Sequence, residues 1–204
     1  MESLALTFSS GWASGVNAYL VVLVLGIADR VSDFAQIPDE LGSWEVLTVA
    51  ALMYAFEFVA DKVPYVDSAW DVISTVIRPL VGGTIGVLLA GDSTEISGLL
   101  GGSVGGASAL ASHAVKAGSR LAVNTSPEPA SNIALSIGED VVVLALVWFA
   151  IEHPYIAAAI AGVLLLVGLV VLYFAIRLIR SGWRRFKAWR QRRRARERPR
   201  SAAG

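Results

Sequence analysis

The stretch YIAAAIAGVLLLVGLVVLYFAI, Tyr155–Ile176, decides the fold class, because none of its 22 residues is charged. An α-helix rises about 1.5 Å per residue, so about 20 residues span the ~30 Å hydrocarbon core of a bilayer. A water-soluble core helix of this length would carry a polar face, and this one carries none. The sequence therefore predicts an integral membrane protein.

The composition of the whole chain agrees with that prediction. Of the 204 residues, 55% are hydrophobic and the mean hydropathy is +0.61. Cysteine is absent, which excludes disulfides and thiolate metal sites. The start, MESLALTFSSGW, lacks the features of a cleaved signal peptide. Phosphate-binding loops and nucleophile motifs are missing from the sequence, so we expect neither an enzyme nor a bound cofactor.

The basic residues are concentrated at one end of the chain. Twelve of the 17 lie from Arg177 onward, which leaves five Lys or Arg against 16 Asp or Glu before that point. Basic flanks of membrane helices stay in the cytoplasm, so we expect a plasma-membrane protein with a cytoplasmic C-terminus. The tail is expected to lie on anionic lipid; nucleic acid is the weaker alternative and is not expected as a partner. The membrane-surface candidates are Arg184, Arg185, Lys187 and Arg190.

The pattern of apolar runs predicts an all-α polytopic membrane protein. A single transmembrane domain is expected over residues 1–178, followed by a basic tail, 179–204, that is flexible or an interfacial helix. Glycine, proline and polar residues interrupt several runs, which a membrane tolerates only inside protein or along a watery cavity. The first and fourth segments therefore either cross the membrane or form re-entrant hairpins, which return to the side on which they enter. The six expected segments are 11–28, 44–60, 72–90, 96–118, 131–152 and 155–178.

A faint internal repeat suggests two halves, 8–92 and 96–178. GVNAY at residues 15–19 resembles GASAL at residues 106–110. Two halves with an odd number of spans would have opposite orientations, which is the inverted-repeat plan of many transporters. Six spans and a cytoplasmic C-terminus would also place the N-terminus in the cytoplasm.

Glycines spaced by four open the fourth segment. Such a spacing produces a flat helix face that allows a second backbone to approach closely. Gly101 and Gly105 form one such pair. We expect packing inside the fold, with a homodimer interface as the alternative. The longer glycine series is Gly98, Gly102 and Gly106.

The first polar cluster is EFVADKVPYVDSAWDVISTVIRP, residues 57–79. Glu57 lies inside an apolar run, where an ionisable group costs several kcal/mol unless it is paired, hydrated or protonated. It is therefore either half of a structural ion pair or part of a cation or proton site. Pro64 is expected to divide the cluster, with the two later acids on a second short helix. Its charged residues are Glu57, Asp61, Lys62, Asp67, Asp71 and Arg78.

The second polar cluster is HAVKAGSRLAVNTSPEPASNIALSIGED, residues 113–140. His113, Lys116 and Arg120 have the spacing of one helical face. A proline turn then leads to a helix that carries Glu139 and Asp140 to bilayer depth. Lys116 and Arg120 are nearly the only bases outside the tail, so we expect them to meet the acids of the first cluster.

Two binding alternatives remain open for these clusters. Bases beside the start of the following helix could hold an anion. Oxygen and imidazole ligands could hold a metal, although no metal-binding spacing supports this and the metal is left unknown. The ligands of such a metal would be Glu57, Asp61, His113 and Glu139.

Three long strings resemble the domain-of-unknown-function 4126 family of bacterial multi-pass membrane proteins. They are GWASGVNAYLVVLVLGIADR, EFVADKVPYVDSAWDVISTVIRP and KAGSRLAVNTSPEPASNIALSIGED, within roughly residues 8–150. The resemblance implies a membrane protein and names no substrate. The signature polar positions that it implies are Asn17, Glu57, Asp61, Lys62, Pro64, Asp67, Asp71, Arg78, Lys116, Arg120, Asn124, Glu128, Asn132, Glu139 and Asp140.

The function that these patterns favour is a small transporter or channel for an ion or small solute. Glu57 and Glu139 are expected to face each other near the bilayer midplane. One alternative is a protein that binds or translocates an anionic lipid through Lys116, Arg120 and Arg78. The other is a structural or assembly protein whose charges are all satisfied pairs.

Overall fold

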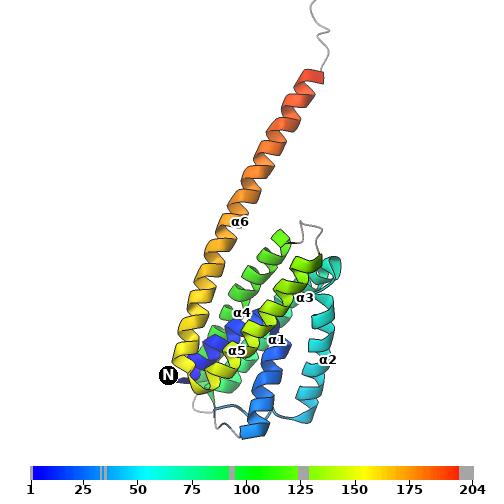
Figure 1. The fold of residues 1–204 in the computed structure, drawn as a ribbon. Coiled ribbons are helices and arrows are strands. Elements are labelled where there is room, and N and C mark those ends of the chain that lie inside the picture. Colours follow the sequence, from blue (N-terminus) through cyan, green and yellow to red (C-terminus); the bar gives the residue numbers. More distant parts are fainter. Residues whose placement is uncertain (1, 33, 35, 92–94, 124–128, 198–204) are drawn as a thin grey trace, which may run out of the picture. The chain divides into compact units, whose positions relative to one another are not determined.

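The computed structural model describes residues 2–32, 34, 36–91, 95–123 and 129–197, and all regular secondary structure in these ranges is α-helical (Figure 1). The chain forms two units, Met1–Gly168, which we call the bundle, and Leu169–Gly204. The all-α prediction is confirmed. The helices are α1 Glu2–Ser32, α2 Trp44–Ala60, α3 Pro64–Ala90, α4 Glu95–Val123, α5 Pro129–Glu152 and α6 Pro154–Glu197.

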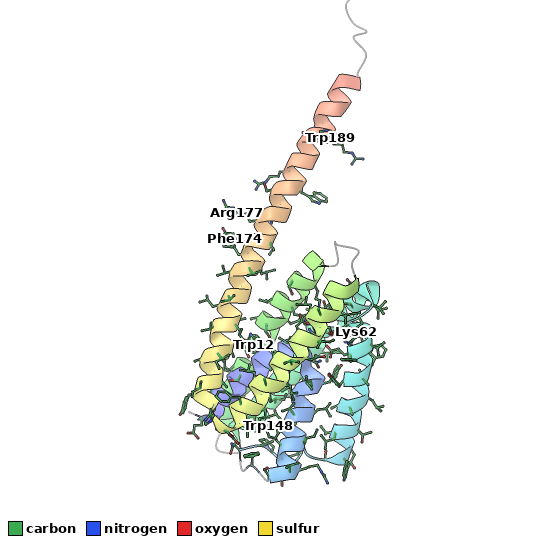
Figure 2. The ribbon with its side chains drawn as sticks, viewed as in Figure 1. Trp12, Lys62, Trp148, Phe174, Arg177 and Trp189 are labelled. Atoms are coloured by element: carbon green, nitrogen blue, oxygen red, sulfur yellow. The ribbon has the colours of Figure 1, made fainter. Side chains whose placement is uncertain are left out.

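Four described helical stretches are long and apolar enough to cross a membrane: Glu2–Ser32, Val66–Ala90, Ile133–Glu152 and Pro154–Arg177. Large apolar side chains project outward from the helices (Figure 2). In water such a surface would drive association, whereas in a bilayer it contacts acyl chains at no cost. The fold is that of a helical membrane protein. Examples of these exposed side chains are Leu52, Phe56, Val76, Leu80, Leu144, Trp148, Leu166 and Phe174.

Helix α1 is broken in its middle. Asn17 has φ −151° and ψ 97°, which is extended rather than helical backbone. Figure 1 shows the two halves of α1 as blue rods that meet at an angle. In the first half, Gly11 and Gly15 pack directly against the backbone of α4 near Gly105 and Ala109. This half therefore runs along α4 in the same direction.

The second half of α1 returns toward the N-terminus. Ser3 and Gln36 line the same cavity, and the Gln36 side chain donates a hydrogen bond to the Ile151 carbonyl at 2.9 Å. A straight helix of 31 residues would separate its ends by about 46 Å. Both ends of α1 thus lie at one end of the bundle, together with the α5–α6 junction. The α2–α3 turn lies at the other end, which we call the turn end.

Of the alternatives for the first and fourth segments, the structure shows a broken helix for 11–28 and an unbroken one for 96–118, within α4. The expected boundaries of the second segment, 44–60, are confirmed by α2.

Asp67 and Asp71 lie on a second helix after Pro64, as expected, but the expectation that this helix is short is wrong. Helix α3 starts at Pro64 and runs without interruption, so Asp67, Asp71 and Arg78 share one helix. Proline suits the first helical turn because its missing N–H would have no intrahelical partner there. Helix α5 likewise begins at Pro129, two residues before the expected start.

Helices α3 and α4 approach each other through glycines. A Cβ on Gly105 would overlap the carbonyl oxygen of Gly82, and one on Gly101 would overlap that of Gly86. The closest contact is thus made by the Gly101 and Gly105 pair rather than by the longer glycine series. In that series, an added Cβ would lie 2.8 Å from a Val87 methyl at Gly102, 3.2 Å from the Pro79 carbonyl at Gly106, and 3.8 Å from Val87 at Gly98. The homodimer alternative stays a prediction.

In the second unit, α6 continues as a helix to Glu197. Trp183 and Trp189 are exposed, and so are the predicted surface residues Arg184, Lys187 and Arg190. The side chain of Arg185 lies outside the described residues. Of the two expected forms of the tail, flexible or helical, the structure shows a helix as far as Glu197.

Candidate functional site

Arg78, at the middle of α3, holds one side of the candidate site. Its guanidinium pairs closely with the Oε1 atom of Glu57, and both side chains are 1% exposed. A second ion pair, of 3.8 Å, joins it to Asp71. Arg78 also lies 2.9 Å from the His113 ring nitrogen Nδ1. The predicted face of His113, Lys116 and Arg120 on α4 indeed points into this region.

Lys116 lies at the centre of the site. Its Nζ atom is 3.1 Å from Asp61, 3.6 Å from Glu139 and 3.8 Å from Glu57. The three carboxylates come from α2, the turn after it, and α5, so a single ammonium group connects elements that are far apart in sequence. This contact confirms the predicted meeting of the two polar clusters.

Arg120, one turn further along α4, completes the arrangement. Its guanidinium lies 2.6 Å from Glu139, 3.1 Å from Asp67 and 3.2 Å from Asp61. It also donates to the main-chain carbonyl of Asp61 at 2.9 Å. We call the eight ion-paired residues the charge network: Glu57, Asp61, Asp67, Asp71, Arg78, Lys116, Arg120 and Glu139.

The break in α1 is part of the same site. A helix that ends at residue 16 leaves carbonyl groups without intrahelical partners. Arg78 donates to the Gly15 carbonyl at 3.1 Å, and Lys116 donates to the Val16 carbonyl at 2.8 Å. Two bases of the charge network thus stabilise the negative end of the first half of α1.

Asn17 connects the break to a further acid. Its side-chain oxygen accepts a hydrogen bond from the Leu20 amide at 3.0 Å, as a residue capping the second half of α1 would. Its side-chain nitrogen donates to Asp140 at 2.9 Å. The Tyr54 hydroxyl lies 3.4 Å from the other oxygen of Asp140.

Asp61 and Lys62, in the turn between α2 and α3, differ in their contacts with the network. Burial opposes the ionisation of Asp61, but the positive charges of Lys116 and Arg120 outweigh it and hold the pKa of its carboxyl below the usual value. Lys62 instead donates to the Phe58 carbonyl at 2.7 Å, and partial desolvation lowers the pKa of its ammonium group. Lys62 therefore contributes at the edge of the site.

The numbers of acidic and basic side chains in the network are unequal. Five carboxylates face three bases among the described residues. The Oε2 atom of Glu57 is buried and has no hydrogen-bond partner there. Excess negative charge in a low-dielectric region is costly, so protons or cations that enter it are bound favourably.

Histidine takes part in the site as a hydrogen-bonding group. The His113 Nε2 atom lies 3.1 Å from the Thr75 hydroxyl and 3.2 Å from the Asp71 carbonyl. In the ranges that the structure describes, no group of three or more His, Asp or Glu side chains is arranged to hold a metal ion.

Three predicted site residues cannot be placed against the network. Asn124 and Glu128 lie outside the described residues, and the side chain of Asn132 on α5 does too.

Sequence reasoning also missed contributors. Tyr54 and Thr75 each precede a predicted site residue, Glu57 or Arg78, by one helical turn, and that spacing could have indicated them. The carbonyls at the α1 break carried no sequence signal.

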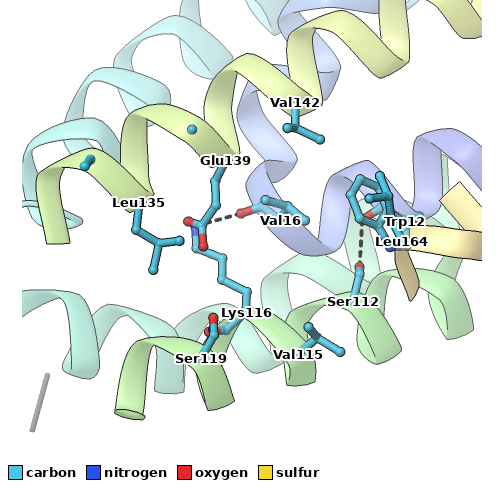
Figure 3. Close-up of a pocket in the computed structure, with 12 residues that line it drawn as sticks. Trp12, Val16, Ser112, Val115, Lys116, Ser119, Leu135, Glu139, Val142 and Leu164 are labelled. Carbon is cyan, nitrogen blue, oxygen red and sulfur yellow. Dashed lines mark hydrogen bonds and ion pairs between the residues drawn. The ribbon is translucent and has the colours of Figure 1, made fainter. Parts of the chain in front are cut away.

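A cavity of about 390 Å³ adjoins the network between α1, α4, α5 and α6. Figure 3 shows two of its lining side chains, Lys116 of α4 and Glu139 of α5, pointing toward each other. The remaining walls are mostly apolar and include Trp12, Val16, Leu135, Val142 and Leu164.

Broken and unbroken apolar helices around a buried charge network define a polytopic helical membrane protein. The chain belongs to the family described as "Domain of unknown function (DUF4126)", whose model matches residues 4–174. No curated protein and no solved structure matches the chain.

Proposed function

We propose that the protein is a small transporter or channel for a cation or proton, and that the charge network is its ion-coupling site. The observation that carries this proposal is the break in α1 at Asn17, which opens beside a network with more acids than bases. Discontinuous helices of this kind form the ion and substrate sites of many transporters.

The cost of building such a site argues for a function. A helix break exposes carbonyl groups, and eight ionisable groups, seven of them buried, must be desolvated. Apolar residues of similar volume would stabilise a purely structural core at least as well. The Oε2 atom of Glu57 has no hydrogen-bond partner among the described residues, which makes this carboxylate our candidate for exchanging a proton or contacting an ion.

The position of two acids in the network follows from the fold. Glu57 lies one turn before the end of α2, and Asp61 lies in the turn itself. These two acids therefore lie toward the turn end of α2, and the depth of the network in the membrane stays a prediction.

The same arrangement weakens the anionic-lipid alternative. Lys116 and Arg120 each contact at least two carboxylates, and Arg78 also pairs with two. An anionic headgroup would have to displace these carboxylates. The charge balance favours a positive ligand.

Ion flux into liposomes tests the proposal. The full chain is reconstituted with a pH-sensitive dye or an ion indicator inside, and a gradient of protons, Na⁺ or K⁺ is imposed. We expect wild-type flux above that of empty liposomes and a loss of about tenfold or more for Glu57→Gln, which keeps a hydrogen-bond acceptor for Arg78 but removes the charge.

Glu45→Gln, on the exposed first turn of the same helix, is the matched control and is expected to behave as wild type. Circular dichroism and size-exclusion chromatography verify that each variant is folded. If Glu57→Gln does not fold, Asp71→Asn replaces it. Wild-type liposomes that match empty ones for all three ions would contradict the proposal and leave the lipid-binding and structural alternatives.

A further inference from the structure

We infer that the cavity beside Glu139 binds a monovalent organic cation, in which an ammonium group carries apolar substituents. This inference rests on the proposed function, because it names the substrate class that would reach the charge network. Four properties of the cavity carry it: its size, the side on which it opens, its charge and its aromatic wall.

The size of the cavity matches a small organic molecule. Its volume is about 390 Å³, and small-molecule sites typically measure about 300–1,000 Å³ with mainly apolar walls. Val16, Val115 and Leu135 supply such walls here. A bare inorganic ion needs no apolar enclosure of this volume.

The cavity opens on the lipid-facing surface of the bundle. Val142 and Leu164, two of its lining residues, are 41% and 37% exposed. Trp12 and Val16, also in its wall, are buried. An apolar molecule that partitions into the membrane meets an apolar entrance, and only its polar group needs a partner inside.

The charge inside the cavity selects a cation. Lys116 lines the cavity, but its ammonium lies within 4 Å of three carboxylates and donates to the Val16 carbonyl. Glu139 is the most accessible of the acids around it, with its side chain 14% exposed.

The geometry of Glu139 leaves room for a ligand. Both of its ion pairs in the described residues, to Lys116 and Arg120, use the Oε2 atom. The Oε1 atom is therefore the one that can face an incoming ammonium group. Trp12 adds an indole to the cavity wall, and an indole face attracts organic cations.

Binding to the purified full chain in a neutral detergent tests the inference without any transport. The probe is labelled benzyltrimethylammonium, measured by equilibrium dialysis. We expect saturable binding that excess tetrapropylammonium displaces and that benzenesulfonate, an aromatic anion, does not. Absence of saturable binding, or equal displacement by benzenesulfonate, would overturn the inference.

Two variants locate the site. Glu139→Gln should weaken binding by about tenfold, as expected for the loss of a partly desolvated charge pair, whereas Glu152→Gln at the end of the same helix should not. If Glu139→Gln fails to fold, Trp12→Leu, which changes an indole outside the charge network, should weaken binding by about threefold or more. Unchanged binding in the folded variant would refute the assignment of this cavity.

A further displacement experiment distinguishes a lipid headgroup from a free organic cation as the source of the ammonium group. Displacement of the probe by short-chain phosphatidylethanolamine, but not by phosphatidylglycerol, would assign the cavity to an ammonium lipid headgroup. Displacement by tetrapropylammonium alone would assign it to a free cation. Proton flux without probe binding would remove this inference and leave the proposed function standing.

Discussion

At the scale of single residues, Asn17 determines how two distant parts of the site meet. Its side chain caps the second half of α1 through the Leu20 amide and donates to Asp140 on α5. Without it, the second half of α1 loses a cap and a buried carboxylate loses a donor. An asparagine at this point therefore supports both the break and the network beside it.

Replacing Asn17 tests this role. Asn17→Ala should lower the free energy of unfolding by about 2–4 kcal/mol, because it removes a helix cap and leaves Asp140 without this donor. Asn17→Ser retains a capping oxygen and should lose less. The measurement is unfolding in mixed detergent micelles followed by circular dichroism, and an Asn17→Ala variant as stable as wild type would contradict the role.

At the scale of elements, the contact between α3 and α4 aligns the two helices that carry all three bases of the network. Gly82 and Gly86 on α3 face Gly101 and Gly105 on α4 with no space for a Cβ. Close backbone approach of this kind replaces side-chain packing in membrane helices. Their separation sets where Arg78, Lys116 and Arg120 meet the carboxylates.

Two glycines on α4 provide a matched comparison. Gly105→Ala should destabilise the protein by about 1–3 kcal/mol, because its Cβ would overlap the Gly82 carbonyl. Among the described residues, the added Cβ of Gly98→Ala would meet only Val87, at 3.8 Å, and this variant should be neutral or stabilising by up to about 1 kcal/mol through helix propensity. Thermal unfolding in detergent compares them, and equal stability of the two variants would refute this account of the interface.

At the scale of the whole molecule, the return of α1 leads us to a topology that differs from six straight spans. We propose that α1 re-enters on the side where it starts and that five helices cross. The N-terminus then lies opposite to the basic tail, whereas six crossings would place both termini in the cytoplasm.

Single-cysteine labelling tests this topology, because the natural chain has no cysteine. Ser3→Cys and Glu40→Cys should both react with a membrane-impermeant maleimide in intact cells. Lys187→Cys should react only after the membrane is permeabilised. Opposite reactivity of Ser3→Cys and Glu40→Cys would show that α1 crosses the membrane.

Much of this architecture was predictable from local patterns. Hydropathy runs indicated the helical class and the bounds of α2, and the spacing of His113, Lys116 and Arg120 indicated their shared face. The break at Pro64 and the acids on the helix after it were predicted, but the continuity of that helix with the 72–90 segment was missed, because Asp67 and Asp71 interrupt the hydropathy run that marks the segment.

The sequence by itself determined that this protein is a helical membrane protein and that its few central bases must meet its buried acids. Both conclusions follow from the cost of charge in a bilayer, which depends on composition and local spacing. Only the tertiary structure decided that α1 breaks at Asn17 and which acid meets which base. The carbonyls released by the break are stabilised by Arg78 and Lys116, which lie 63 and 100 residues away from them in the chain.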